Sequence, residues 1–157
     1  MDFKTARSNM VENQIRANKV TNLSVINAFK DVPREKFVPD PLQEISYVDE
    51  DIQLSRNRFM MKPMILARLF QSLNLQGNEN ILHVGSNTGY GSAILSRMCS
   101  SVISLESDKK LFEKSIHTFS NMGFDNVVPL HGSMESGVEK EAPFDIIFIE
   151  GSIETEP

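Results

Sequence analysis

The stretch that decides the fold is ILHVGSNTGYGSAIL, residues 81–95. Its first residues predict a short buried strand over 80–84, and a helix is expected over 90–99, with a glycine turn between the two. Gly85 and Gly89 lack a Cβ, so the backbone of this turn can approach a ligand closely. In an open α/β sheet, ligands bind outside the carboxyl end of such a strand. The turn could alternatively do no more than join the strand to the helix.

The spacing of the glycines bears on the kind of ligand. A dinucleotide-binding fingerprint that begins at Gly85 requires glycines at 87 and 90, where this chain has Asn87 and Tyr90, so an NAD-dependent oxidoreductase is disfavoured. Glu106 closes a second predicted strand over 101–106, where a carboxylate can accept hydrogen bonds from both ribose hydroxyls of an adenosine ligand. Alone, it could be a solvated strand-end acid. The turn and the acid in this order favour an adenosine cofactor without identifying it.

The rest of the chain predicts an α/β fold with a helical N-terminal part. Further strands are expected over 126–130 and 145–149 (DIIFI), with a helix over 108–122 that ends at Gly123. Strands that alternate with helices indicate a doubly wound, mainly parallel sheet. Residues 1–76 are expected to form a helical extension on the substrate side and residues 77–157 the α/β core, in one compact domain.

Three local features of the chain carry further expectations. Thr21 or Asn22 should cap a helix that ends at Pro33, and Pro63 should begin another helix, whereas residues 39–62 are expected to be irregular. DIIFI is apolar enough to lie centrally in a sheet, yet the sequence stops eight residues after it. We therefore expect C-terminal strands to be missing.

Composition limits the class of protein. A length of 157 residues fits one domain, and a net charge of −5 argues against a nucleic-acid-binding surface. Cys99 is the single cysteine and is interpreted as a buried thiol, and the three histidines lack the spacing of metal ligands, so no metal site is expected. The chain has no apolar run of membrane-spanning length, and its start, MDFKTARS, lacks the apolar core of a secretion signal. These features predict a cytoplasmic protein with no membrane partner.

Three segments of the N-terminal half carry a family resemblance. MVENQIRANKVTN (10–22), VINAFKDVPREKFVP (25–39) and SYVDEDIQL (46–54) resemble the opening of protein-L-isoaspartate O-methyltransferases. The resemblance covers essentially the whole chain in order. It implies a Rossmann-like fold that continues for three more strands, S-adenosyl-L-methionine as the cofactor, and a protein or peptide substrate with a carboxylate. The activity that it implies is methyl transfer to the α-carboxylate of isoaspartyl residues, which starts the repair of damaged protein.

The resemblance also implies a set of site residues. It places Gly85, Ser86 and Gly89 at the methionine end of the cofactor and Glu106 at the ribose. The backbone around Gly132 and Ser133 would lie near the adenine, and Glu150 would face the site at the end of the fourth strand. The cofactor-binding residues implied in this way are His83, Gly85, Ser86, Asn87, Gly89, Glu106, Ser107, Gly132, Ser133 and Glu150.

The chain departs from the family at several of these positions. The acidic residue that closes the first strand is here His83, the middle glycine of the loop is Asn87, and the aspartate on the adenine side is Ser133. We interpret His83 as a core or supporting residue rather than a base, and expect the lost carboxylate to weaken cofactor binding by about one to a few kcal/mol. These departures leave open an alternative, a degenerate domain that acts through protein contacts without catalysis.

The residues expected on the substrate side also differ from those of the family. The family's Thr-Ile-Ser-Gln-Pro is here Phe59-Met60-Met61-Lys62-Pro63, so the catalytic positions hold Phe59 and Met61, without a hydroxyl. Methionine cannot donate a hydrogen bond to a carboxylate, although Lys62 could supply positive charge. We expect weak or no methylation of a standard isoaspartyl peptide, even if cofactor binding is intact. The preferred substrate should carry an apolar group that meets Met60 and Met61.

Overall fold

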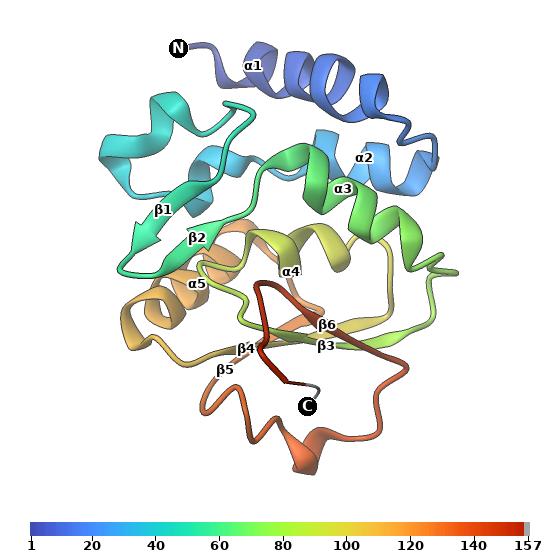
Figure 1. Ribbon diagram of the computed structural model, residues 1–157, viewed down its shortest axis with the longest axis vertical. Coiled ribbons are helices and arrows are strands. Elements are labelled where there is room, and N and C mark those ends of the chain that lie inside the picture. Colours follow the sequence, from blue (N-terminus) through green and yellow to red (C-terminus); the bar gives the residue numbers. More distant parts are fainter. Residues whose placement is uncertain (156–157) are drawn as a thin grey trace. The chain divides into compact units, whose positions relative to one another are not determined.

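The structure, a computed structural model, describes residues 1–155. The chain divides into two compact units, Met1–Leu75 and Gln76–Pro157. Figure 1 colours the chain from blue at the N-terminus to red at the C-terminus. No helix in the described part of the chain is both long and apolar enough to cross a bilayer.

The first unit is built around three helices, α1 (Phe3–Met10), α2 (Leu23–Asp31) and α3 (Pro63–Ser72). After α1 the chain continues through a π turn (Val11–Ile15) and a 3-10 turn (Arg16–Asn18). Asn22 caps α2, because its side chain accepts hydrogen bonds from two backbone amides of the first turn. The apolar faces of α2 and α3 meet where the rings of Phe29 and Phe70 lie 6.4 Å apart. Pro63 begins α3 as predicted.

The prediction of an irregular stretch over 39–62 was wrong. Between the helices lie two 3-10 segments, Arg34–Phe37 and Asp40–Ile45, and an antiparallel hairpin of β1 (Ile52–Ser55) and β2 (Arg58–Met60). The hairpin turns at Asn57, whose φ of 60° is left-handed. Its strands are too short for their apolar alternation to stand out in the sequence.

The second unit contains a parallel sheet of four strands: β3 (Asn80–Val84), β4 (Ser101–Glu106), β5 (Val127–His131) and β6 (Ile146–Ile149). Their order is β5-β4-β3-β6 (Figure 1), which confirms the predicted Rossmann-like α/β fold. The chain moves outward from β3 to β5 on one side and then crosses to place β6 on the other side of β3. Ligands in open α/β sheets bind at the carboxyl ends of the strands at such a reversal.

Two helices accompany these strands, α4 (Tyr90–Leu95) and α5 (Lys109–Met122). The helix expected over 90–99 is thus shorter than predicted. The carboxylate of Asp108 caps α5, and Gly123, with φ 69°, ends it as expected. A short 3-10 turn, Glu139–Glu141, precedes β6.

In the part of the chain that the structure describes, DIIFI forms the edge strand β6 rather than a central strand. There β6 pairs with β3 alone, and Ile147 is 61% exposed. Its neighbours in the strand still contact apolar groups on both faces of the sheet. Ile149 packs against the cluster of Leu82 and Val84, and Phe148 lies with its ring 5.3 Å from that of His83.

Candidate active site

The loop between β3 and α4 is held in a conformation that few residue types adopt. Gly85, Asn87 and Gly89 have positive φ angles of 75°, 55° and 94°. Asparagine tolerates this region, as expected for position 87. At Gly89 a Cβ would lie 2.3 Å from Cζ of Phe119 on α5. Gly89 therefore serves close packing between the loop and α5, a structural reason that the sequence did not reveal.

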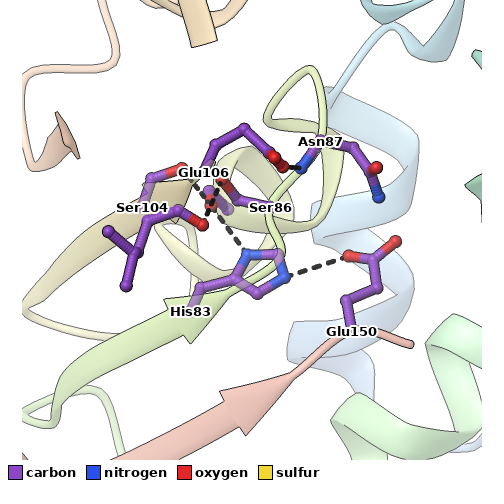
Figure 2. A network of polar contacts seen from close by, with 8 residues as sticks. His83, Ser86, Asn87, Ser104, Glu106 and Glu150 are labelled. Atoms are coloured by element: carbon purple, nitrogen blue, oxygen red, sulfur yellow. Dashed lines mark hydrogen bonds and ion pairs between the residues drawn. The ribbon is translucent and has the colours of Figure 1, made fainter. Parts of the chain in front are cut away.

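Glu106 anchors this loop from the end of β4. Its Oε2 accepts a hydrogen bond of 2.7 Å from the amide of Asn87, which Figure 2 shows, and its Oε1 accepts one of 2.8 Å from the amide of Asp108. The side chain is fully buried. Hydrogen bonds to a charged acceptor are among the stronger ones in proteins. Glu106 is thus a structural link between the loop and the start of α5, as well as a candidate ligand for ribose.

A second polar group joins β3, α4, β4 and β6. His83 is fully buried, and its Nδ1 lies 2.7 Å from Oγ of Ser92, which in turn donates a hydrogen bond of 2.8 Å to Oγ of Ser104. On the other side of the ring, Nε2 lies 3.0 Å from Oε2 of Glu150 (Figure 2). The interpretation of His83 as a supporting residue agrees with this burial.

The remaining predicted cofactor residues lie at the same edge of the sheet. Ser86 is buried, with its amide and hydroxyl donating to the carbonyl of Leu105. Gly132 donates to the carbonyl of Glu106 at 3.1 Å, and Ser133 next to it is exposed. Ser107 is exposed and its carbonyl lies 3.0 Å from Nε2 of His131. Because the four strands are parallel, all ten predicted residues lie along the same end of the sheet, at or after the carboxyl ends of the strands.

The two predicted catalytic positions lie in the first unit, in and after β2. Phe59 is 48% exposed, whereas Met60 is only 1% exposed, because neighbouring residues of a strand point to opposite faces. The expectation that Met60 meets a substrate was therefore wrong. The carbonyl of Met61 accepts a hydrogen bond of 3.0 Å from Nη2 of the buried Arg34. The amide of Lys62 donates to Oδ1 of Asp51 at 2.8 Å.

Sequence reasoning missed Ser92, Ser104 and Gly91. Ser104 could have been found, because a parallel register that aligns the starts of the first two strands pairs it with His83, as observed. Position 91 requires a glycine, because a Cβ there would lie 2.6 Å from Oε2 of Glu150 and 2.8 Å from Cε1 of His83. Nothing in the sequence placed Glu150 beside position 91, since that proximity depends on the pairing of β6 with β3.

Two further observations concern reactive groups. Burial raises the pKa of the Cys99 thiol to about 12, which agrees with its interpretation as a buried, unreactive cysteine. Among residues 1–155 no group of three or more His, Cys, Asp or Glu side chains is placed to hold a metal ion.

Comparison with known proteins bears on the identity of this site. Residues 5–157 match the family described as protein-L-isoaspartate(D-aspartate) O-methyltransferase (PCMT). The chain belongs to this family. The resemblance inferred from the N-terminal segments is thereby confirmed.

Similar proteins include two named protein-L-isoaspartate O-methyltransferase 2. The one from Anaeromyxobacter sp. (strain Fw109-5) is 33% identical over 154 residues, and the one from Shewanella sediminis (strain HAW-EB3) is 33% identical over 155 residues. These alignments cover 98% and 99% of this chain. The chain spans 63% and 64% of the length of these two relatives.

Solved structures show the same fold. A protein-L-isoaspartate O-methyltransferase superposes with a TM-score of 0.79 and 24% identity, covering 91% of this chain and 47% of the other. A beta-aspartate methyltransferase (PCMT) from Plasmodium falciparum, in complex with S-adenosyl-L-homocysteine, gives a TM-score of 0.78 and 22% identity, covering 100% of this chain and 77% of the other.

Proposed function

We propose that this chain binds S-adenosyl-L-methionine and takes part in methyl transfer to a carboxylate of damaged protein. The observation that carries the proposal is the match to the PCMT family over residues 5–157. Two further points support it: the glycine loop and Glu106 lie together at the carboxyl ends of β3 and β4, and the Plasmodium falciparum structure contains the product form of this cofactor.

The arrangement of the second unit fits an adenosine cofactor. The loop over 85–89 brings backbone without bulky side chains to the strand ends, which suits the methionine end. Glu106 presents a carboxylate in a fixed orientation, which suits hydrogen bonds from ribose hydroxyls. Because Glu106 has no exposed surface, residues that cover it must move for a ligand to reach it. Gly132 and Ser133 follow β5 at the adenine side.

The chemistry that the cofactor supplies is an electrophilic methyl group. A carboxylate acceptor is already ionised at neutral pH, so this chain needs no general base. Its residues have to align the two reactants and exclude water. The absence of a base among the predicted catalytic residues, Phe59 and Met61, is therefore compatible with methyl transfer.

We further propose that the two parts of the chain bind different reactants. Residues 1–76 would supply the substrate side, through Phe59 and Met61, and residues 77–157 would bind the cofactor. The acidic charge of the chain supports a protein or peptide substrate over a nucleic acid. A single buried cysteine supports a cytoplasmic location, where thiols remain reduced.

The test of this function has a binding step and a turnover step. S-adenosylhomocysteine should raise the melting temperature of the chain and NAD should not, because only a ligand of the folded state stabilises it. A chain that binds no S-adenosylhomocysteine by calorimetry would contradict the proposed cofactor.

Turnover is measured on an isoaspartyl peptide, with the aspartyl peptide as control. Met61→Ser restores a hydroxyl that can donate to the substrate carboxylate, so it should raise the isoaspartyl rate about ten- to a hundredfold over the unchanged chain. Equal rates for the two proteins would show that the lost hydroxyl does not limit the reaction. Methylation of neither peptide by either protein, despite cofactor binding, would favour the non-catalytic alternative.

A further inference from the structure

Glu150 has a buried carboxylate oxygen that accepts no hydrogen bond from the described residues. Its side chain is 5% exposed, and its Oε2 makes no hydrogen bond within the described residues, although Nε2 of His83 lies 3.0 Å away. A buried charge that lacks a donor is costly. Such a group indicates that a cation or a hydrogen-bond donor from elsewhere completes it.

His83 contacts Glu150 without forming a hydrogen bond of good geometry with it. Nδ1 of His83 lies 2.7 Å from Oγ of Ser92, and Nε2 on the opposite side of the ring faces Oε2 of Glu150. Ser92 itself is fully buried, so the Ser92–His83–Glu150 series does not present a nucleophile for hydrolysis.

The position of Glu150 limits what its partner can be. The amide of Glu150 donates to the carbonyl of Val84 at 3.0 Å, so the carboxylate lies at the end of β6 next to the start of the glycine loop. This is the point of the sheet where the strand order reverses. Gly91 leaves room for the carboxylate, since any larger residue would bring its Cβ within 2.6 Å of Oε2.

We propose that Glu150, positioned by His83, binds the ammonium group at the methionine end of the cofactor. The assignment rests on the proposed function, because it takes its ligand from there. In this chain position 83 is a histidine and carries no carboxylate. The carboxylate of Glu150, at the end of the neighbouring strand β6, lies 3.0 Å from the His83 ring and supplies a negative charge there instead (Figure 2). The expected weakening of cofactor binding by the change to His83 is then offset by Glu150.

The test compares two ligands that differ only at the methionine end. S-adenosylhomocysteine carries the ammonium group, whereas 5′-methylthioadenosine has the same adenosine and thioether but no amino-acid part. Glu150→Gln keeps the size and shape of the side chain while removing its charge. It should weaken S-adenosylhomocysteine about ten- to a hundredfold in calorimetry and leave methylthioadenosine unchanged within about twofold.

Gly91→Ala provides a second variant, because it keeps the charge but displaces the carboxylate. It should also weaken S-adenosylhomocysteine selectively. Glu141→Gln, which removes an exposed carboxylate of the same unit, is the matched control and should change neither affinity. Melting temperatures of all variants show whether each is folded.

The possible failures are distinguishable. Parallel losses of both ligands in Glu150→Gln, or unchanged binding of S-adenosylhomocysteine, would overturn the role of Glu150 while leaving the proposed function intact. If the unchanged chain binds methylthioadenosine but not S-adenosylhomocysteine, the proposed function and the ligand assigned to Glu150 both fail.

Discussion

The link from Glu106 to two backbone amides can be tested by Glu106→Gln. The carboxylate accepts from Asn87 through one oxygen and from Asp108 through the other, at 2.7 and 2.8 Å. Glutamine keeps one oxygen and replaces the other by an NH2 group, which would face an N–H donor. One hydrogen bond to a charged acceptor is lost, which costs about 1.5 to 3 kcal/mol. For a chain of this length that corresponds to a drop in melting temperature of about 3 to 12 °C.

The measurement is thermal unfolding without ligand, followed by circular dichroism. Glu113→Gln is the control: it removes a carboxylate that is 56% exposed and 3.9 Å from Lys109, and should change stability by less than about 0.5 kcal/mol. If Glu106→Gln melts at the temperature of the unchanged chain, Glu106 does not hold the loop. Loss of S-adenosylhomocysteine binding with full stability would instead assign the side chain to the ligand alone.

Two further predictions concern packing and titration. Gly89→Ala should lower the free energy of unfolding by about 2 to 4 kcal/mol in urea, because its Cβ would meet Phe119 and its φ is 94°. Gly77→Ala, at a similar φ of 101° but with open space around it, should cost only about 1 to 2 kcal/mol. Similar costs for the two variants would refute the packing argument. Burial raises the pKa of the Cys99 thiol from 9.0 to about 12, so the thiol ionises at lower pH in the unfolded chain than in the folded one. The free energy of unfolding should therefore fall as the pH rises from about 9 towards 12. Cys99→Ala should lack that part of the decline, and identical pH profiles for the two proteins would contradict the burial of the thiol.

Local patterns were sufficient for much of the fold. The apolar strands over 80–84 and 101–106 have the predicted bounds, Pro63 begins its helix, and Gly123 ends α5. These features depend on residues close together in the chain, through apolar periodicity and capping. The short hairpin of residues 52–60 escaped prediction because three or four residues carry too little periodicity.

The sequence by itself determined that a glycine loop follows the strand over 80–84 and that an acidic residue closes the strand over 101–106, and from these it predicted an adenosine site at the carboxyl ends of a parallel sheet. Only the tertiary structure decided that β6 lies beside β3, which places Glu150 3.0 Å from His83 and makes Gly91 necessary. It also decided that Met60 faces the core while Phe59 is exposed. The physical reason is that strand order and side-chain pairing depend on contacts between segments far apart in the chain, which leave no local pattern in the sequence.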